Sequence, residues 1–184
     1  DLMRFIVYDD DGGVSAFDPR PIGTEAIVGF LERSLPERVN RVNAQHLAKA
    51  QGIELRVSQS ESGRDYLSLI EVETVGAGKR TTVAGTLLDG RLPRIVRIDG
   101  YHVEAVPEGH FLFTRHHDRP GVVGALGGIL GREEINITRM NVGIDDHAGT
   151  SAIALVSISS PLSASALTEI RALPQIIEAV EFAL

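Results

Sequence analysis

The chain has 184 residues, of which 43% are hydrophobic and 23% charged, a composition ordinary for a soluble globular protein with one sizeable domain or two small ones. Its formal net charge of −7 and its lack of any basic run argue against nucleic-acid binding. The absence of cysteine excludes disulfides and cysteine-zinc sites and fits the cytoplasm, and no apolar run approaches the roughly 20 residues that span a bilayer.

The first half of the chain is predicted to fold as a largely antiparallel sheet with two helices. Its expected strands are Leu2–Tyr8, Val14–Phe17, Ile53–Val57, Leu67–Val75, Thr81–Leu87, Ile95–Ile98 and Tyr101–Val106. The first two are expected to form a hairpin around residues 9–13. Gly76-Ala77-Gly78 is a second hairpin signal, and Asp99-Gly100 favours a type I′ turn because both central residues need positive φ.

Two helices are expected in this half. Pro19 and Pro21 break the chain, and from Thr24 the apolar residues recur at helical spacing, which predicts one buried face. That face consists of Ile27, Phe30, Leu31 and Leu35. A shorter helix is expected over Ala44–Ala50, ended by Gly52.

After a linker at Val106–Gly109, strands and helices are expected in the order βαββαβ, which is the ferredoxin-like arrangement. The expected strands are His110–Arg115, Ile137–Ile144, Ser151–Ile158 and Ile176–Ala183. The two helix faces are marked by Val122, Leu126 and Leu130 and by Leu162, Ala166, Ile170 and Leu173. The predicted fold class is therefore α+β, with one module over residues 1–107 and a second over residues 108–184.

The candidate chemistry lies where the first strand of the second module joins its first helix. Pro120 suits the first turn of a helix, and Gly121 lets a ligand approach the backbone. The N–H groups of a helix N-terminus attract a carboxylate, and Asp118 could hold an ammonium group, so the two together suit a free amino acid. The residues leave a second interpretation open, in which Asp118 simply caps the helix.

Two neighbouring features bear on this site. Asn136 opens the next strand, and its amide can hold either end of an amino acid, although a turn role explains it equally well. The helix is rich in glycine, with Gly124, Gly127, Gly128 and Gly131, each costing about 1 kcal/mol relative to Ala inside a helix. Their spacing does not match a nucleotide-binding loop, so close packing against a sheet, a partner chain or a ligand is the expected reason.

The segment HHDRPGVVGALGGIL at residues 116–130, followed by EEINI at residues 133–137, resembles the ACT-domain signature. Three upstream segments, residues 38–53, 82–87 and 94–100, resemble the intervening domain of long-form D-3-phosphoglycerate dehydrogenase. The resemblance covers residues 14–184, and the order and spacing of the motifs make it specific. The catalytic part of that family is N-terminal to these modules and resembles nothing here. Since the chain also begins at Asp1 rather than Met, we expect it to be the C-terminal portion of such an enzyme.

The resemblance implies a regulatory function. The family's intervening domain is called the allosteric substrate-binding domain, and its ACT domain binds L-serine, the pathway end product, across a dimer interface and inhibits the enzyme. The implied effector contacts are His116, Asp118 and the backbone of Pro120, Gly121 and Val122 on one chain, with Asn136 on the other. Some members carry Asn in place of Asp118. The implied parent is a homo-oligomeric enzyme of serine biosynthesis with NAD in its catalytic domain and no cofactor in this chain.

A candidate anion site is expected in the first module from Arg94, Arg97 and His102, because the family can bind a phosphorylated substrate there. Arg94 and Arg97 are three residues apart near a strand and so point to opposite faces, which favours the alternative of solvent-facing charges. No metal site is predicted, since the acidic residues at 9–11 lack the spaced ligands of a calcium loop and the histidines lack the partners of a zinc site.

Two other functions stay open from the sequence. The chain could be the regulatory part of an L-serine dehydratase, which can carry similar modules, or a stand-alone ACT protein that forms dimers or senses amino acids. Catalysis by the chain itself has no support in the sequence, because it contains no activated nucleophile, metal cage or cofactor loop.

Overall fold

The computed structural model describes residues 2–9, 18, 20–32, 34–35, 38–60, 66, 68–144 and 150–184. By its internal contacts the chain divides into two compact units, Asp1–Pro93 and Arg94–Leu184. The division falls inside strand β5 (Leu92–Ile98), so most of β5 belongs to the second unit. The module boundary after Pro107 stays a prediction.

The first unit combines a sheet with two helices. Its elements are β1 (Leu2–Asp9), α1 (Arg20–Glu32), α2 (Ala44–Ala50), β2 (Glu54–Ser60), β3 (Ser68–Gly76) and β4 (Lys79–Leu88). The strands lie in the order β2-β1-β3-β4, with β1 parallel to β2 and the other neighbouring pairs antiparallel. The predicted largely antiparallel sheet is therefore confirmed, and β1–β2 is a parallel pair within it. The predicted strand at residues 14–17 lies outside the described residues.

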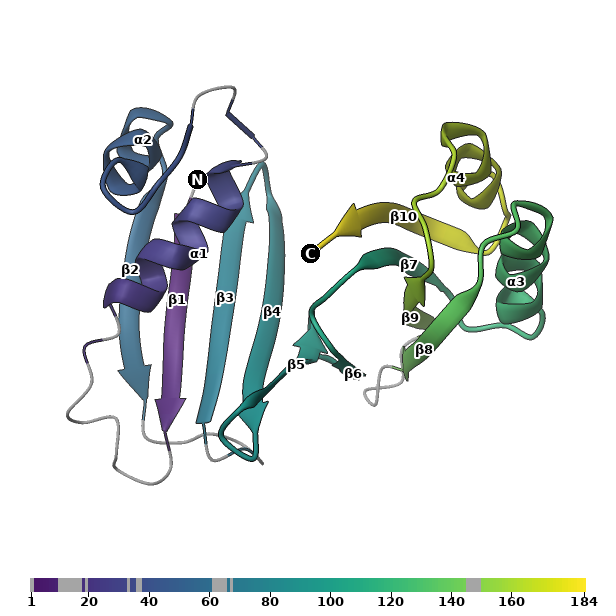
Figure 1. The fold of residues 1–184 in the computed structure, drawn as a ribbon, viewed down its shortest axis with the longest axis horizontal. Coiled ribbons are helices and arrows are strands. Elements are labelled where there is room, and N and C mark those ends of the chain that lie inside the picture. The colour runs from purple at the N-terminus through teal and green to yellow at the C-terminus, as the bar shows by residue number, and fades with distance from the viewer. Residues whose placement is uncertain are drawn as a thin grey trace. The chain divides into compact units, whose positions relative to one another are not determined.

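Helix α1 crosses one face of this sheet and begins earlier than predicted (Figure 1). Pro21 does not break the chain, because it lies in the first turn of α1, where its missing N–H is not needed. The side chain of Asp18 accepts a hydrogen bond from the N–H of Arg20 at 3.0 Å and so supports this start. The buried residues of α1 are Gly23, Ile27 and Leu31. Phe30 is 43% exposed, because it lies at the margin of that stripe, so its predicted place on the buried face is wrong.

The core of the first unit lies between the two helices and the sheet. Its buried residues are Met3, Ile27, Leu31, Val39, Ala44 and Ala48. Helix α2 has the predicted range, and Ala44 and Ala48 form its buried face, one turn apart. Gly52 follows with a φ of +71°, the left-handed conformation that glycine adopts after a helix.

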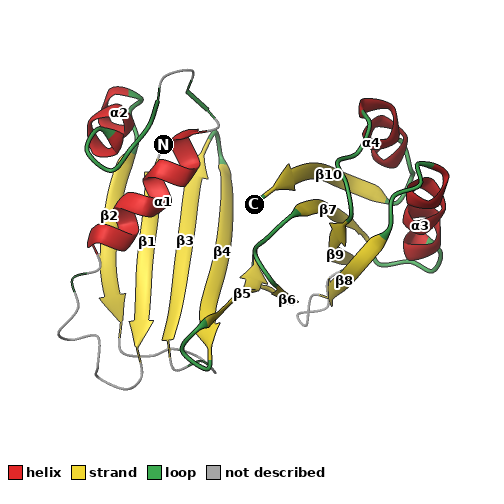
Figure 2. Cartoon of the chain, in the orientation of Figure 1, coloured by secondary structure: helices red, strands yellow, loops and turns green. Residues whose placement is uncertain are grey.

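The second unit is an antiparallel sheet with two helices on one face (Figure 2). After β5 its elements are β6 (Tyr101–Ala105), β7 (His110–His117), α3 (Val122–Arg132), β8 (Ile137–Ile144), β9 (Ser151–Ile158), α4 (Ala164–Arg171) and β10 (Ile176–Ala183). The four-stranded sheet has the order β10-β7-β9-β8, and each neighbouring pair is antiparallel. From β7 onwards this is the predicted βαββαβ arrangement.

The two faces of this sheet are covered differently. On one face α3 and α4 enclose aliphatic side chains, among them Leu112, Leu126, Leu130, Val156 and Ile170. On the other face the β5–β6 hairpin encloses Ile98, Tyr101, Val103, Ala105, Phe111, Ile153 and Leu155. The hairpin turns at Asp99 and Gly100, whose φ values of +49° and +87° confirm the predicted type I′ turn. The hairpin is therefore part of the core of the second unit.

Candidate functional site

The loop between β7 and α3 is anchored through its backbone while its side chains stay exposed. The N–H of His117 donates to the carbonyl of Gln175 at 2.8 Å, and the N–H of Asp118 donates to the carbonyl of Thr150 at 2.8 Å. Residues 118–121, which include Asp118, Pro120 and Gly121, are all exposed. The loop thus has a fixed starting point at the end of β7, and its polar groups are accessible to a ligand.

The N-terminus of α3 carries no cap from any described side chain. Its N-cap residue is Gly121, which has a left-handed φ of +96° and offers no side-chain acceptor. Asp118 is not the N-cap residue, and no side-chain cap hydrogen bond is found at this N-terminus among the described residues. The structure therefore does not support the interpretation of Asp118 as a helix cap. The first-turn N–H groups of a helix have no partner within the helix, and here they are available to an anion. Val122 is 3% exposed, so it presents its backbone rather than its side chain to the loop.

His116 lies on β7, two residues before Asp118, and its side chain is 3% exposed. Strand alternation places it on the same face as Leu112, the face that the helices cover. Its Nδ1 is 3.2 Å from Oγ1 of Thr114. Burial lowers the pKa of His116 below its ordinary value, while the carboxylate of Asp118 acts in the opposite direction and His117 adds to the lowering. His116 is therefore a neutral imidazole at physiological pH, with one donor and one acceptor.

Asn136 is not brought together with the loop residues within one chain. It precedes β8, where its N–H donates to Oγ of Ser159 at 3.0 Å and its carbonyl accepts from the N–H of the same serine at 3.0 Å. In the sheet register the first residue of β8 is level with Ile158 and His110, whereas the β7–α3 loop leaves the sheet at the His117 end. Asn136 and Asp118 thus lie at opposite ends of the same sheet, with Asn136 exposed.

The three residues of the candidate anion site all lie on the β5–β6 hairpin. Arg97 and His102 are cross-strand partners and therefore share a face of the hairpin. Arg94 Nε lies 3.7 Å from Oε1 of Glu104. Of the three residues, Arg94 thus lies beside a carboxylate, and Arg97 and His102 lie next to each other on the two strands.

The glycines of α3 are not explained by close packing within the chain. A Cβ built on Gly124, Gly127 or Gly131 meets no described atom within 4 Å, and one on Gly128 meets only the end of the Arg132 side chain at 3.9 Å. The expected close packing is therefore wrong for contacts within the described chain. The close approach occurs instead at Gly143 on β8, where a Cβ would lie 2.8 Å from the carbonyl oxygen of His102.

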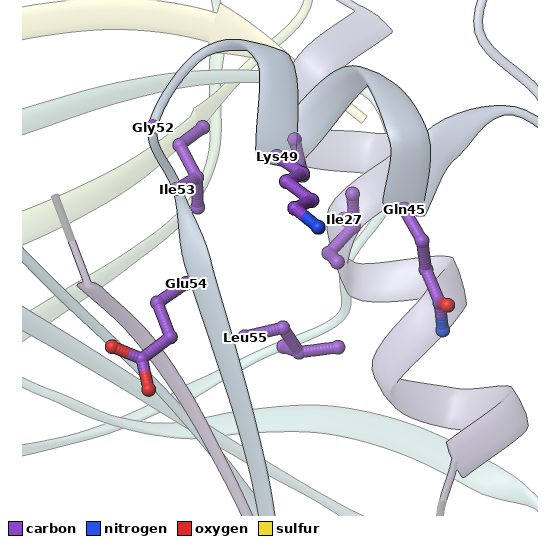
Figure 3. Close-up of a pocket in the computed structure, with 8 residues that line it drawn as sticks. Ile27, Gln45, Lys49, Gly52, Ile53, Glu54 and Leu55 are labelled. Atoms are coloured by element: carbon purple, nitrogen blue, oxygen red, sulfur yellow. The ribbon is translucent and has the colours of Figure 1, made fainter.

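The first unit contains a pocket of ≈ 500 Å³ that is not among the sites predicted from the sequence (Figure 3). Gln45 and Lys49 extend over it from α2, and the buried Ile27 of α1 contributes to its apolar lining. Glu54 lies at its edge, with its carboxylate pointing away from Lys49. The spacing of Gln45 and Lys49, one helical turn apart beside the buried face of α2, is the sequence signal that points to this surface.

In the described part of the chain, no group of three or more His, Asp or Glu side chains is arranged to hold a metal ion. None of the described helices is long and apolar enough to cross a bilayer.

Both halves of the chain match known protein families. Residues 3–99 match the D-3-phosphoglycerate dehydrogenase intervening domain, and residues 110–175 match the ACT domain. The chain belongs to the D-3-phosphoglycerate dehydrogenase intervening-domain family. The β7–α3 loop therefore lies in an ACT domain, and the pocket beside α2 lies in the intervening domain.

Individual relatives agree with this family. D-3-phosphoglycerate dehydrogenase of Archaeoglobus fulgidus is 38% identical over 152 residues, which is 82% of this chain and 29% of that protein. The protein of the same name from Synechocystis is 36% identical over 151 residues, covering 82% of this chain and 27% of the relative. The protein of the same name from Bacillus subtilis is 34% identical over 177 residues, which cover 95% of this chain and 33% of the relative. The predicted resemblance is confirmed, and the chain spans about a third of the length of these relatives or less.

Proposed function

We propose that this chain is the regulatory part of a D-3-phosphoglycerate dehydrogenase-like enzyme of serine biosynthesis and that it senses L-serine at the start of α3. The observation that carries the proposal is the uncapped N-terminus of α3, which stands beside the exposed Asp118 and the buried His116 in an ACT domain. Serine binding inhibits the parent enzyme, and NAD binds in the parent's catalytic domain rather than here. A cytoplasmic location stays a prediction from the composition.

The chemistry of the loop matches the two charged ends of a free amino acid. The α-carboxylate accepts hydrogen bonds from the first-turn N–H groups of α3, which the helix dipole strengthens. Gly121 has no side chain to obstruct this approach, and the carboxylate of Asp118 holds the α-ammonium group. The neutral imidazole of His116 is positioned at the end of β7 to bond the polar side chain of serine. The negative end of the ligand thus meets the partial positive charge of the helix N-terminus, and its positive end meets the negative charge of Asp118.

A second copy of the chain supports this site through β8. This strand is at the edge of the described four-stranded sheet, and an unpaired edge favours pairing with another strand. Asn136 lies at the far end of β8 from Asp118. If two β8 strands pair antiparallel, Asn136 of the partner subunit comes to the end of the sheet that carries Asp118. The dimer thereby completes a site that a single chain leaves open.

The test is calorimetric titration of the chain with L-serine, with glycine and L-alanine as comparators. We expect selective L-serine binding at one or two sites per dimer. Asp118→Ala removes the ammonium partner and should weaken binding about tenfold or more, the effect of losing one charged hydrogen bond. The matched control is Glu108→Ala, which removes an exposed carboxylate from the same unit and should leave the affinity unchanged.

Two outcomes would contradict the proposal. Unchanged serine affinity in the Asp118→Ala variant would sink the assignment of the ammonium site. A dimer that binds none of the three amino acids would instead favour a stand-alone dimerisation module.

A further inference from the structure

The β5–β6 hairpin makes polar contacts with the same end of the sheet that carries the β7–α3 loop. The hydroxyl of Tyr101, on β6, lies 2.7 Å from Oγ of Ser151, the first residue of β9. Ser151 is the cross-strand partner of His117, the last residue of β7. The tyrosine hydroxyl therefore bonds to the strand that runs beside the start of the loop.

Arg115 forms a second connection between the hairpin and β7. Its guanidinium pairs with the carboxylate of Asp99 in the hairpin turn and lies over the ring of Tyr101, 5.6 Å from the ring centroid. Its Nε is also 3.8 Å from Oε2 of Glu178 on β10. Arg115 and Asp99 are mainly buried, with side-chain exposures of 21% and 16%, so this ion pair is shielded from much of the solvent.

Both contacts are close in sequence to residues that anchor the loop. Thr150, which precedes Ser151, accepts the hydrogen bond from the N–H of Asp118. On the β7 side, Arg115 is two residues before His117 and three before Asp118. The hairpin thus contacts two of the three chain segments whose backbone groups fix the beginning of the loop, namely the end of β7 and the Thr150–Ser151 segment but not Gln175.

The hairpin also packs closely against this sheet. The carbonyl oxygen of His102 lies where a Cβ on Gly143 would be 2.8 Å away, so the backbones of β6 and β8 approach more closely than any side chain would allow. The Tyr101 ring is buried in the cluster that also contains Ile153 and Phe111. Packing therefore fixes the hairpin without the tyrosine hydroxyl or the Asp99 carboxylate. These two polar groups add contacts specifically at the loop end.

We propose that Tyr101 and Asp99 are positioning residues for the effector loop, acting through Ser151 and Arg115. They hold the Thr150–Ser151 backbone and the end of β7 so that Asp118 and the start of α3 are preorganised for the ligand. This inference rests on the proposed function for the identity of the ligand, but the positioning of the Asp118 N–H can be measured in the free chain as well. A preorganised site spends less binding free energy on ordering the loop.

The experiment compares Tyr101→Phe, Asp99→Asn and Ser151→Ala with the unmodified chain. Phe keeps the buried ring, and Asn tolerates the left-handed φ of residue 99, so the fold is retained. The two readouts are L-serine affinity by calorimetry and hydrogen exchange of the Asp118 amide without ligand. Each variant should weaken serine binding about three- to tenfold, the range for one hydrogen bond, and should speed exchange of that amide.

Two further variants separate positioning from general stability. Ser151→Thr keeps the hydroxyl and should restore both readouts toward those of the unmodified chain. Thr168→Val removes a hydroxyl that bonds the carbonyl of Ala164 on α4 at 2.7 Å, and it should leave both unchanged. The double variant Tyr101→Phe/Ser151→Ala should bind L-serine as tightly as either single variant does, because both substitutions remove the same contact.

The outcomes are distinguishable from those of the proposed function. If Tyr101→Phe and Ser151→Ala leave both serine affinity and Asp118 exchange unchanged, the positioning role is overturned. If the unmodified chain binds no serine, the proposed function fails, and faster Asp118 exchange in these variants would still support the positioning role. If Thr168→Val weakens binding as much as Tyr101→Phe does, the effect is one of general stability and the inference is wrong.

Discussion

The two helices of the second unit are packed alike but begin differently. The N-cap residue of α4 is Ser163, whose hydroxyl oxygen accepts a hydrogen bond from the N–H of Ala166 at 3.1 Å and whose O–H donates to Glu133 at 2.7 Å. The N-cap residue of α3 is Gly121, and no described side chain caps this helix. Both helices cover the same face of one sheet and share one core. The difference therefore does not come from packing.

This contrast distinguishes the candidate site from the rest of the unit more sharply than the fold does. A βαββαβ unit has two equivalent positions where a strand leads into a helix, and many unrelated proteins have that topology. In this chain Ser163 caps the N-terminus of α4, whereas no described side chain caps that of α3, where we propose that the ligand binds. Substitutions in the shared core probe the similarity of the two helices, and substitutions at the N-caps probe the difference between their N-termini.

The largest expected effect concerns the shared core. Leu126→Ala on α3 and Ile170→Ala on α4 each remove a side chain that is 0% exposed. Each should lower the free energy of unfolding by about 2–5 kcal/mol, because a buried cavity is left behind. Denaturant unfolding followed by circular dichroism measures both. A loss below about 1 kcal/mol, the average for an ordinary substitution, in either variant would contradict the view that the helices are equally well packed.

The next effect concerns the two N-cap positions. Gly121→Ala places a side chain at a φ of +96° and should cost about 1–2 kcal/mol of stability. Ser163→Ala removes the cap of α4 and should cost about 1 kcal/mol. The two variants therefore have similar stability losses, but they differ in ligand binding: Gly121→Ala should weaken serine binding and Ser163→Ala should not. If both variants weaken L-serine binding equally, the two helix N-termini do not differ in function as proposed.

A smaller effect of opposite sign is expected inside α3. A Cβ on Gly124 or Gly127 meets no described atom within 4 Å, so alanine fits in both positions. Each substitution should raise the free energy of unfolding by about 0.5–1 kcal/mol through the better helix propensity of alanine. Thermal unfolding and sedimentation measure stability and oligomeric state together. Destabilisation with loss of a dimer would show that the glycine face of α3 packs against a partner.

The smallest expected effect is a dependence of stability on pH. Because the pKa of His116 is lowered in the folded chain, mainly by burial, the unfolded chain binds a proton more readily than the folded chain does. The stabilisation of the folded chain by neutral His116 is complete above the pKa of this histidine in the unfolded chain, about 6.5, and it is lost as the pH falls below that value. His116→Gln removes this titration. Between pH 7.5 and 5.5, roughly the range in which histidine titrates, the free energy of unfolding should therefore fall more steeply for the unmodified chain than for the variant. If the two curves of unfolding free energy against pH run parallel, the lowered pKa of His116 is not the cause.

The order and type of most elements could be predicted because they depend on local patterns. Helix α2 and the Asp99-Gly100 turn follow from helical spacing and from the φ values that a type I′ turn requires. The predicted start of α1 at Thr24 is too late, because Pro21 lies in the first turn of the helix, where proline is tolerated. The parallel pairing of β1 with β2 depends on residues about fifty positions apart, such as Met3 and Leu55, and no local pattern specifies it.

The candidate site shows the same division between local and distant information. The loop residues Asp118 and Gly121 follow from a contiguous motif and from the rules for helix N-termini. The burial of His116 and the bond between Tyr101 and Ser151 depend on how β6, β7 and β9 come together, and the last two residues are 50 positions apart. Glycine content suggested that α3 packs closely, but glycine has more than one use, and the structure assigns the close approach to Gly143 instead.

The most direct test is an NMR titration of the ¹⁵N-labelled chain with L-serine, comparing the first-turn amides of the two helices. We expect the amide resonances of Val122, Val123 and Gly124 in α3 to shift with the ligand concentration. The amides of Ala164, Ser165 and Ala166 in α4, which serve as the internal control, should not move. Shifts of similar size at both N-termini, or shifts confined to α4, would contradict the claim that the uncapped start of α3 is the binding site.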